Sequence, residues 1–314
     1  MAKTNIQWAA TYHTDGSVTK GETWNPVTGC SKVSPACAHC YAEALSLRYG
    51  WSKHPWTPQF VAENIVLHPD RLKTPLTWCK KRTVFVNSMS DLFHEYIPMD
   101  YIAQVYAIMA LASEHTFQVL TKRPQRMQNL LTYPVFEDLV DKHVERISGE
   151  RGWCITDSGE WPLKNVWHGV SVENQHWADI RIPYLLRTPS VIRFLSCEPL
   201  LGSVDLDPYL QKVIRVTDPD LDAPDGAIVN GMQRVKSHWF RTEYLHWIIV
   251  GGESGPKHRP MQPRWAHEIF NQCQRHGVAF FFKQWGGRTP KAGGDHLYGQ
   301  QWHQMPGEHS GGNS

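Results

Sequence analysis

Six short runs of β-branched and aromatic residues recur along this chain of 314 residues, and each run ends in a small polar signature. The runs cover residues 83–86, 116–120, 166–170, 191–195, 247–250 and 278–282. Runs of this composition predict buried strands, and segments with helical periodicity lie between them. With a short strand just before Cys30, the pattern predicts about seven strands. Strands that alternate with helices favour a parallel sheet whose faces are covered.

Two of the intervening segments carry helix boundary signals. Residues 99–113 keep apolar side chains at helical spacing and follow Pro98, which suits the first turn of a helix. Residues 265–276 stop at Gly277, a residue type that often ends helices. We therefore expect an α/β fold, a partial or full (β/α) TIM-like barrel of about six to seven parallel strands. In such folds ligands bind at the carboxyl ends of the strands, where the polar signatures fall.

The barrel is expected to form a single domain over residues 1–287, with two insertions. The first, near residues 147–165, is rich in glycine and turn residues, and the second, near residues 201–244, contains the basic and aromatic stretch QRVKSHWFRTEY. Long insertions in compact folds are often lids or binding loops, although a plain surface loop is the alternative. Residues 288–314 are expected to form a mobile C-terminal tail.

Composition narrows the class of protein. No apolar run approaches the roughly 20 residues that span a bilayer, and the N-terminal MAKTNIQWAA lacks the apolar core of a signal peptide. We therefore expect a cytoplasmic protein without a membrane partner. The net charge of +2 neither requires nor excludes a polyanionic partner. Seven cysteines are an odd number, and four of them are scattered, which suits reduced thiols better than disulfides.

The other three cysteines, Cys30, Cys37 and Cys40, lie within eleven positions directly ahead of an expected helix. A structural zinc site requires four ligands, whereas an iron-sulfur cubane held by three cysteines leaves one iron with an open coordination position. The spacing is therefore compatible with a reactive cluster. It is also compatible with zinc if His39, His54 or another distant histidine supplies the fourth ligand.

The cysteine cluster resembles that of the radical S-adenosylmethionine superfamily, which usually spaces its cysteines three and then two apart. Here the motif is Cys30-x6-Cys37-x2-Cys40, with His39 where the superfamily has an aromatic residue. More specifically, signatures spanning residues 23–287 resemble a family of phage and prophage proteins regarded as radical-SAM-like. They read TWNPVTGCSKVSPACAHCYAE, NSMSDLFH, VLTKRP, GVSVEN, FLSCEPLLG and VGGESG.

The resemblance implies a [4Fe-4S] cluster on the three cysteines, S-adenosylmethionine chelated at the open iron, and an external electron donor. It implies a location in the host cytoplasm if the protein is phage-encoded. It also assigns cofactor-binding residues to the strand ends. These are Asn87, Ser88, Ser90, Asp91, Lys122, Ser171, Glu173, Asn174, Gly251, Gly252 and Glu253.

The individual roles follow the order of the strands. Residues 87–91 take the position where the superfamily holds the methionine amino group, often with the sequence Gly-Gly-Glu. Lys122 and its neighbour Arg123 would pair with the methionine carboxylate or a substrate phosphate. Residues 171–174 would bond the ribose hydroxyls. In this chain Gly-Gly-Glu occurs at 251–253, where glycines allow close approach to the adenine or ribose, or simply form a tight turn.

Three further residues are candidate catalytic groups. Glu198 could bind an amino group or move a proton. Cys197 could supply a hydrogen atom to a substrate radical, although a lone buried cysteine is usually an inert apolar side chain. Lys283, followed by Gln284 and Trp285, closes the expected ring of strand ends and is a candidate substrate contact.

The sequence thus predicts an enzyme that cleaves S-adenosylmethionine and abstracts hydrogen from its substrate. A nucleic-acid base or modified nucleotide is the favoured substrate, for hypermodification of phage DNA or equally for repair of a damaged base. The first alternative is a non-catalytic nucleic-acid or protein interaction module with structural zinc. The second is an iron-sulfur protein for redox sensing or electron transfer. Hydrolases lack support, because no nucleotide triphosphate signature, Gly-x-Ser-x-Gly elbow or His-Glu-x-x-His pair is present.

Overall fold

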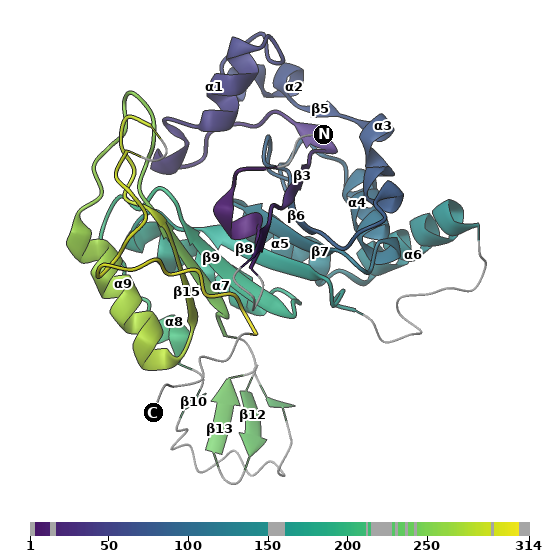
Figure 1. Cartoon of the computed structure of the whole chain (residues 1–314). Helices are drawn as coiled ribbons and strands as arrows, with labels where there is room; N and C mark the ends of the chain where they lie inside the picture. The colour runs from purple at the N-terminus through teal and green to yellow at the C-terminus, as the bar shows by residue number, and fades with distance from the viewer. Residues whose placement is uncertain are drawn as a thin grey trace.

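The centre of the protein is a seven-stranded parallel sheet that curves into a half-barrel (Figure 1). The computed structural model describes residues 4–12, 17–149, 161–211, 244–289 and 292–307, together with the backbone of strand segments 213–214, 228–229, 232–235 and 238–241. The strands of the sheet, in spatial order, are β3 (Glu22–Trp24), β6 (Thr83–Val86), β7 (Thr116–Thr121), β8 (Val166–Ser171), β9 (Ile192–Cys197), β14 (Trp247–Gly251) and β15 (Ala279–Gln284).

The order of the strands in space is their order in the chain, and every neighbouring pair is parallel. Each connection must therefore carry the chain back to the end of the sheet where the next strand begins. All seven carboxyl ends consequently lie on one side of the sheet. β3 and β15 form the two edges of the sheet, which leaves the barrel open. We call the side where the carboxyl ends meet the mouth. The predicted partial TIM-like barrel is confirmed.

Helices cover the convex face of the sheet (Figure 1). The longest helices of the described chain are α4 (Met99–Leu111), α6 (Pro134–Ser148), α7 (Gln175–Arg187) and α9 (Pro263–His276). Pro98 is the N-cap of α4, and Gly277 ends α9 with a φ of 59°. Both predicted helix boundaries are therefore confirmed. Shorter helices are α1 (Tyr41–Arg48), α2 (Val61–Asn64), α3 (Pro69–Leu72), α5 (Pro124–Leu131) and α8 (Asp207–Leu210).

The concave face has its own small aromatic core. The N-terminal segment crosses it and places Trp8, from the 3-10 helix η1 (Gln7–Ala9), against side chains of β6, β9 and β14. The Trp8 ring lies 4.7 Å from that of Phe85 and 6.4 Å from that of Trp247. Because side chains alternate along a strand, the same strands present Val84 and Ile248 to the helix-side core. The half-barrel is therefore filled by aromatic rings below the mouth.

Short antiparallel sheets lie outside the half-barrel. β1 (Thr11–Tyr12) pairs with β2 (Val18–Thr19), and β4 (Val27–Thr28) pairs with β5 (Val66–Leu67). The predicted insertion at residues 201–244 contains a four-stranded sheet, in the order β10 (Val213–Ile214), β13 (His238–Arg241), β12 (Met232–Val235) and β11 (Ile228–Val229). Of the insertion predicted at residues 147–165, residues 150–160 lie outside the described part of the chain.

The segment after residue 287 packs on the half-barrel instead of forming a free tail. The backbone N–H of Phe282 donates to the carbonyl of Trp302 at 2.8 Å, and the Trp247 indole donates to the carbonyl of Gln304 at 2.8 Å. Leu297 is fully buried. The fold therefore continues through residue 307, because these aromatic and aliphatic side chains cover β15. No helix in the described ranges has the length and apolar character to cross a bilayer.

Candidate functional site

The three clustered cysteines lie on one segment, residues 29–40, which we call the cysteine loop. It leaves β4 at Gly29, passes through the 3-10 helix η2 (Pro35–Cys37) and ends at Cys40, the N-cap of α1. Gly29 has a φ of +87°, and a Cβ atom there would lie 1.8 Å from the carbonyl oxygen of Asn64. Only glycine fits this position, so the chain is fixed where it enters the loop.

Groups at four strand ends bond the cysteine loop and hold it across the mouth. After β7, the guanidinium Nη2 of Arg123 donates to Ser31 O and Oγ at 3.2 and 3.0 Å. After β8, Glu173 accepts from the backbone N–H of Ala36 at 3.4 Å. After β14, Glu253 lies 3.1 Å from Nδ1 of His39. After β6, the carbonyl of Met89 accepts from the backbone N–H of Gly29 at 3.0 Å.

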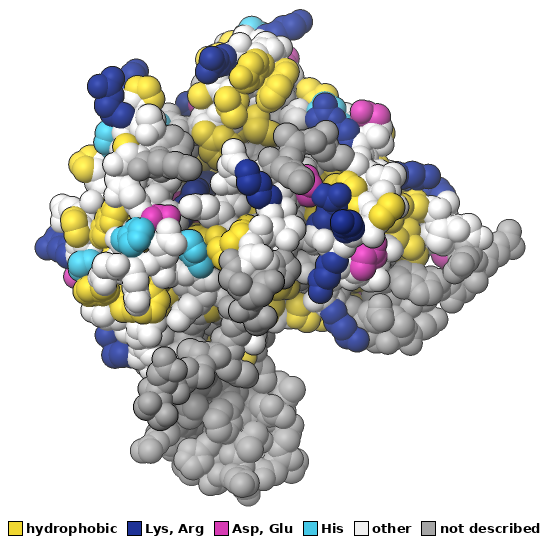
Figure 2. Space-filling model, in the orientation of Figure 1, with side chains coloured by type: hydrophobic (Ala, Val, Ile, Leu, Met, Phe, Trp, Pro, Cys, Tyr) yellow, Lys and Arg dark blue, Asp and Glu magenta, His cyan; other side chains and the backbone are white. Residues whose placement is uncertain are grey.

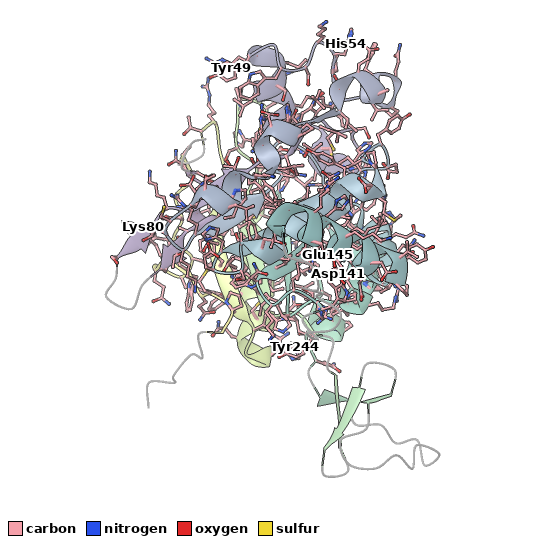
Figure 3. All side chains as sticks on the ribbon, turned by 90° about the vertical axis from the view of Figure 1, so that its right-hand side faces the viewer. Tyr49, His54, Lys80, Asp141, Glu145 and Tyr244 are labelled. Atoms are coloured by element: carbon pink, nitrogen blue, oxygen red, sulfur yellow. The ribbon has the colours of Figure 1, made fainter. Side chains whose placement is uncertain are left out.

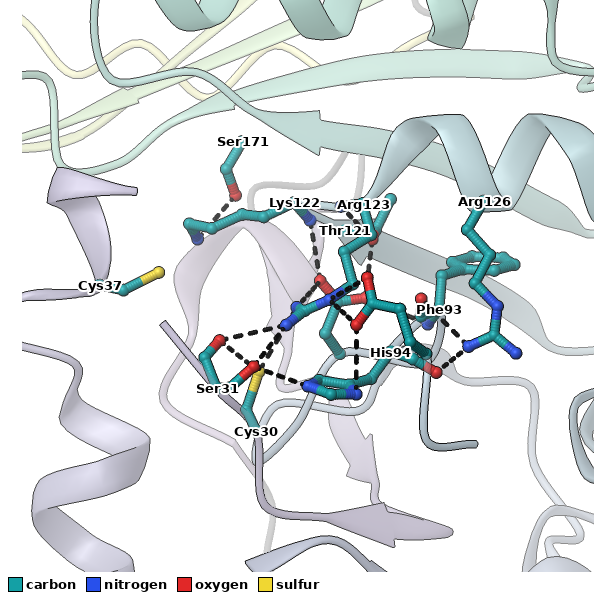
Figure 4. Close-up of polar contacts among 12 residues, drawn as sticks. Cys30, Ser31, Cys37, Phe93, His94, Thr121, Lys122, Arg123, Arg126 and Ser171 are labelled. Carbon is teal, nitrogen blue, oxygen red and sulfur yellow. Dashed lines mark hydrogen bonds and ion pairs between the residues drawn. The ribbon is translucent and has the colours of Figure 1, made fainter. Parts of the chain in front are cut away.

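Arg123 is the most connected side chain of this site (Figure 4). Its Nη1 donates to Asp91 at 3.2 Å and faces the Sγ of Cys30 at 3.6 Å, while its Nε donates to both carboxylate oxygens of Glu95. Burial opposes its charge, but Asp91, Cys30 and Glu95 raise the pKa of the guanidinium. A permanent positive charge therefore sits beside the first cysteine.

Asp91 fixes Arg123 in turn. The Thr121 hydroxyl and the Lys122 and Phe93 backbone N–H groups donate to its carboxylate at 2.7, 2.9 and 3.1 Å. Burial alone would raise the pKa of Asp91, but Arg123 and these hydrogen bonds lower it below the ordinary value. Asp91 is thus a buried, ionised support, which differs from the predicted contact with the cofactor amino group.

The thiols of the cysteine loop share one environment. Burial raises the pKa of Cys30 to about 12 against the opposing charge of Arg123, and burial also raises the pKa of Cys40. Cys37 lies close enough to both thiols to raise their pKa values further, and Lys122 acts on Cys40 in the opposite direction. Three thiols on one short loop with two cations beside them form a donor set suited to an iron-sulfur cluster, whose ligands are thiolates.

The side chains as they stand do not form a closed metal site. Among the residues that the structure describes, no group of three or more His, Cys, Asp and Glu side chains is arranged to hold a metal ion. The candidate zinc ligands are otherwise engaged, since His39 contacts Glu253, and His54 stacks on Phe60 at 4.2 Å and pairs with Glu63. The donor set therefore fits three-cysteine ligation in its chemistry, and neither His39 nor His54 is free to act as a fourth zinc ligand.

A layer of polar side chains lies on the concave face above the aromatic core. We call Lys122, Ser171, Ser196, Glu198 and Lys283 the inner layer. Lys122 Nζ donates to Ser171 Oγ at 3.1 Å (Figure 4), Ser196 Oγ donates to Glu198 at 3.1 Å, and Lys283 Nζ pairs with Glu198 at 2.7 Å. Ser171 and Ser196 are in register on β8 and β9. Four predicted residues thus come together at the mouth: Lys122, Ser171, Glu198 and Lys283.

Gly251 makes room for this layer. A Cβ atom at Gly251 would lie 2.9 Å from a carboxylate oxygen of Glu198, and one at Gly252 would lie 2.0 Å from the carbonyl oxygen of Trp285. The glycines at 251–252 are therefore required by protein groups, which is the tight-turn alternative. Glu253 is held by Arg259, whose Nη2 and Nε donate to it at 2.6 and 3.0 Å.

Cys197, the candidate hydrogen-atom donor, does not face the mouth. Strand alternation directs Ser196 and Glu198 to the concave face and Cys197 to the opposite one. Its side chain is fully buried in the core between sheet and helices, and burial raises its pKa well above the ordinary value. Cys197 therefore packs as a small apolar side chain.

Several residues predicted to bind the cofactor instead support the loops. Asn174 caps α7 by accepting from the Trp177 N–H at 3.2 Å, and Glu173 pairs with the fully buried Arg181 at 2.8 Å. Ser88 bonds the Asn25 side chain, and Ser90 donates to the carbonyl of Val27 at 3.0 Å. Ser88 and Ser90 therefore hold the segment that leads into the cysteine loop.

Asn87 differs from its neighbours. It directly follows β6 with a φ of 60° and is 3 % exposed, yet neither its amide nitrogen nor its amide oxygen has a hydrogen-bond partner. A buried amide without partners costs free energy unless another group satisfies it. Asn87 thus carries a donor and an acceptor without protein partners at the strand end where the sequence predicts a contact with the cofactor.

Sequence reasoning missed two arginines that pair with strand-end glutamates, Arg181 and Arg259. Arg181 and Arg259 lie eight and six residues after the carboxylates that they pair with. Glu95 and His94, which resemble a metal pair in sequence, bond Arg123 and Ser31 respectively. A charged residue one or two turns after a strand-end glutamate is the one signal that could have indicated these pairs.

Fold and site together define an α/β half-barrel protein with a three-cysteine loop bonded across its mouth. The chain belongs to the family described as a protein of unknown function (DUF5131), whose model matches residues 3–306. Comparisons with curated proteins and with solved structures found no significant match.

Proposed function

We propose that this protein is a radical S-adenosylmethionine enzyme that acts on a nucleic-acid base or modified nucleotide. The observation that carries the proposal is the position of the cysteine loop. Cys30, Cys37 and Cys40 lie on a segment that is bonded to four strand ends at the mouth, the place where α/β barrels bind ligands. A structural zinc module would not require this placement.

In the proposed enzyme, Cys30, Cys37 and Cys40 hold a [4Fe-4S] cluster. The cluster would supply the electron, received from an external donor, that cleaves S-adenosylmethionine to a 5'-deoxyadenosyl radical. The protein residues around it would position the cofactor and exclude water. Arg123 and Lys122 balance thiolate charge, and the orphaned amide of Asn87 offers hydrogen bonds to the cofactor.

The inner layer favours a substrate with polar edges. Glu198 and Lys283 present an acceptor and a cation at the mouth. A nucleobase combines hydrogen-bonding edges with an apolar face, and proteins commonly bind it through such groups. This match favours a base or nucleotide over a purely apolar substrate.

Electron paramagnetic resonance tests the proposal. The protein is purified and reconstituted with iron and sulfide without oxygen, reduced with dithionite, and measured with and without S-adenosylmethionine. A cubane signal that shifts on addition of the cofactor is the expected result. A protein that carries one zinc per chain and gives no such signal would overturn the proposal in favour of an interaction module.

Cysteine variants provide the matched comparison. Cys37→Ala should lose the cubane signal, because two thiolates do not hold the cluster in place. Cys79→Ala removes an exposed cysteine outside the loop and should leave iron content and signal unchanged. Equal iron content in both variants would show that the loop is not the cluster site.

A further inference from the structure

A surface at the far end of α1 combines exposed aromatic rings with unpaired cations. We call Leu47, Arg48, Tyr49, Trp51 and Lys53 the α1 patch. Tyr49 and Trp51 are 58 % and 60 % exposed, the highest values among the large apolar side chains described. Single exposed rings are common, but contiguous exposed apolar groups indicate an interaction surface.

The two rings are held in place by the backbone although they are exposed. Tyr49 is the C-cap residue of α1, and Gly50, with a φ of +69°, turns the chain back so that the N–H of Trp51 donates to the carbonyl of Ser46 at 2.8 Å. The Tyr49 and Trp51 rings stack with centroids 5.2 Å apart at 30°. The patch thus offers prearranged flat faces to solvent.

The cations of the α1 patch lack carboxylate partners. Arg48 lies over the Tyr49 ring at 5.7 Å, and within the described ranges neither it nor Lys53 forms an ion pair. The nearby Glu43 is already paired with Lys32 at 2.9 Å. In Figure 2 hydrophobic side chains (yellow) lie over α1 and α2, and Lys and Arg side chains (dark blue) lie at the border of this region. An apolar partner would bury these charges without compensation, so a polyanion suits the surface better.

The α1 patch lies close to the candidate site along the chain. α1 starts one residue after Cys40 and has eight residues, which corresponds to a length of about 12 Å. Figure 3 shows Tyr49 and His54 at the upper end of the molecule, beyond the sheet. A flexible strand that rests on the patch could therefore reach the mouth.

We propose that the α1 patch binds single-stranded nucleic acid. Bases stack on Tyr49 and Trp51, while phosphates pair with Arg48 and Lys53. Aromatic stacking combined with cationic groups along the backbone is how proteins bind single strands without sequence preference. The inference rests on the proposed function only for the role of the α1 patch, which is to guide a base toward the mouth. Binding of the strand to the patch requires no cluster.

Fluorescence anisotropy with labelled 12-nucleotide strands tests the inference on the full chain without iron. We expect single-stranded DNA or RNA to bind more tightly than duplex of the same sequence. Tyr49→Ala/Trp51→Ala should weaken binding tenfold or more, because each stacked base contributes at about this level. Arg48→Gln/Lys53→Gln should reduce the slope of log affinity against log salt by about 1.4, since two phosphate contacts are lost and each contributes about 0.7 on a single strand.

Matched controls change the same residue types elsewhere. Tyr133→Ala removes another half-exposed ring, and Lys142→Gln removes another exposed cation; both should bind like the wild type. Equal losses in the control and patch variants would overturn the inference. Preferential binding to anionic lipid vesicles over single strands would also overturn it and identify a membrane-surface patch. Strand binding that depends on the patch in a protein without a cubane signal would leave this inference standing and remove the proposed enzyme.

Discussion

Arg123 reaches from the end of β7 to the cysteine loop, where its Nη1 lies 3.6 Å from the Sγ of Cys30. The guanidinium is buried and bonded at the same time to Asp91, Glu95 and Ser31, so it cannot turn away without breaking charge-assisted hydrogen bonds. The position of the first cysteine is therefore coupled to the carboxyl end of the sheet.

Arg123→Gln should lower the free energy of unfolding by about 3 kcal/mol, because it leaves the Asp91 carboxylate buried without its charge partner. Urea unfolding at neutral pH measures the change. The double variant Asp91→Asn/Arg123→Gln removes both charges and should recover part of the loss. A loss below about 1 kcal/mol in the single variant would mean that the pair contributes no more than a surface ion pair.

A second prediction concerns acid pH. Burial raises the pKa of Glu253, but the hydrogen bonds from Arg259 and His39 lower it from the ordinary value of 4.5 to about 2. A carboxyl whose pKa is depressed in the folded state stabilises it above the ordinary pKa, and this contribution is lost as the pH falls from about 4.5 toward 2. Glu253→Gln should therefore destabilise the protein by up to about 3 kcal/mol at pH 7.

The difference between Glu253→Gln and the wild type should shrink once the pH falls below about 4.5. Urea unfolding between pH 7 and pH 3.5 follows this difference. Glu145→Gln, which neutralises an exposed carboxyl on α6, should be close to the wild type at every pH. A constant difference between Glu253→Gln and the wild type across the range would show that its ionisation contributes nothing.

The strands could be predicted because their signal is local. In β7 and β14 a short apolar run predicts the strand, and the polar residues that follow it mark the carboxyl end. The parallel order of the strands follows from the helices between them. The direction of individual side chains was also within reach. Alternation along β9 separates Cys197 from Ser196 and Glu198, and applying it would have excluded Cys197 from the mouth.

The partners of the strand-end carboxylates could not be predicted in the same way. Glu173 and Glu253 both follow strands, as ligand-binding residues do, but their partners Arg181 and Arg259 become neighbours only when helix and loop fold back. A residue that binds a ligand and a residue that holds a loop can both be polar and can both follow a strand, so the sequence does not separate the two roles. Only the three-dimensional contacts distinguish Glu173 from Glu198.

Asn87 provides a test of cofactor binding that is separable from folding. Asn87→Gly keeps the positive φ without strain and removes an unsatisfied amide, so the stability should stay within about 1 kcal/mol of the wild type. The affinity of the reconstituted protein for S-adenosylmethionine, measured by calorimetry, should fall at least tenfold. Ser88→Ala, which loses a bond to Asn25, should reduce stability by about 1 kcal/mol and keep the affinity. The reverse pattern would assign the ligand contact to Ser88.

Variants of Glu198 and Lys283 distinguish a role in the reaction from a role in the stability of the mouth. Their ion pair is partly exposed, with side-chain exposures of 13 % and 27 %, so breaking it should cost only about 1 kcal/mol of stability. We expect Glu198→Gln and Lys283→Met to retain iron and the cubane signal and to form 5'-deoxyadenosine under dithionite at the wild-type rate, because both residues are proposed to contact the substrate. Lys257→Met, at an exposed position after β14, should cleave S-adenosylmethionine at the wild-type rate. Slower formation of 5'-deoxyadenosine in either inner-layer variant would show that the changed residue acts on the cofactor and not only on the substrate.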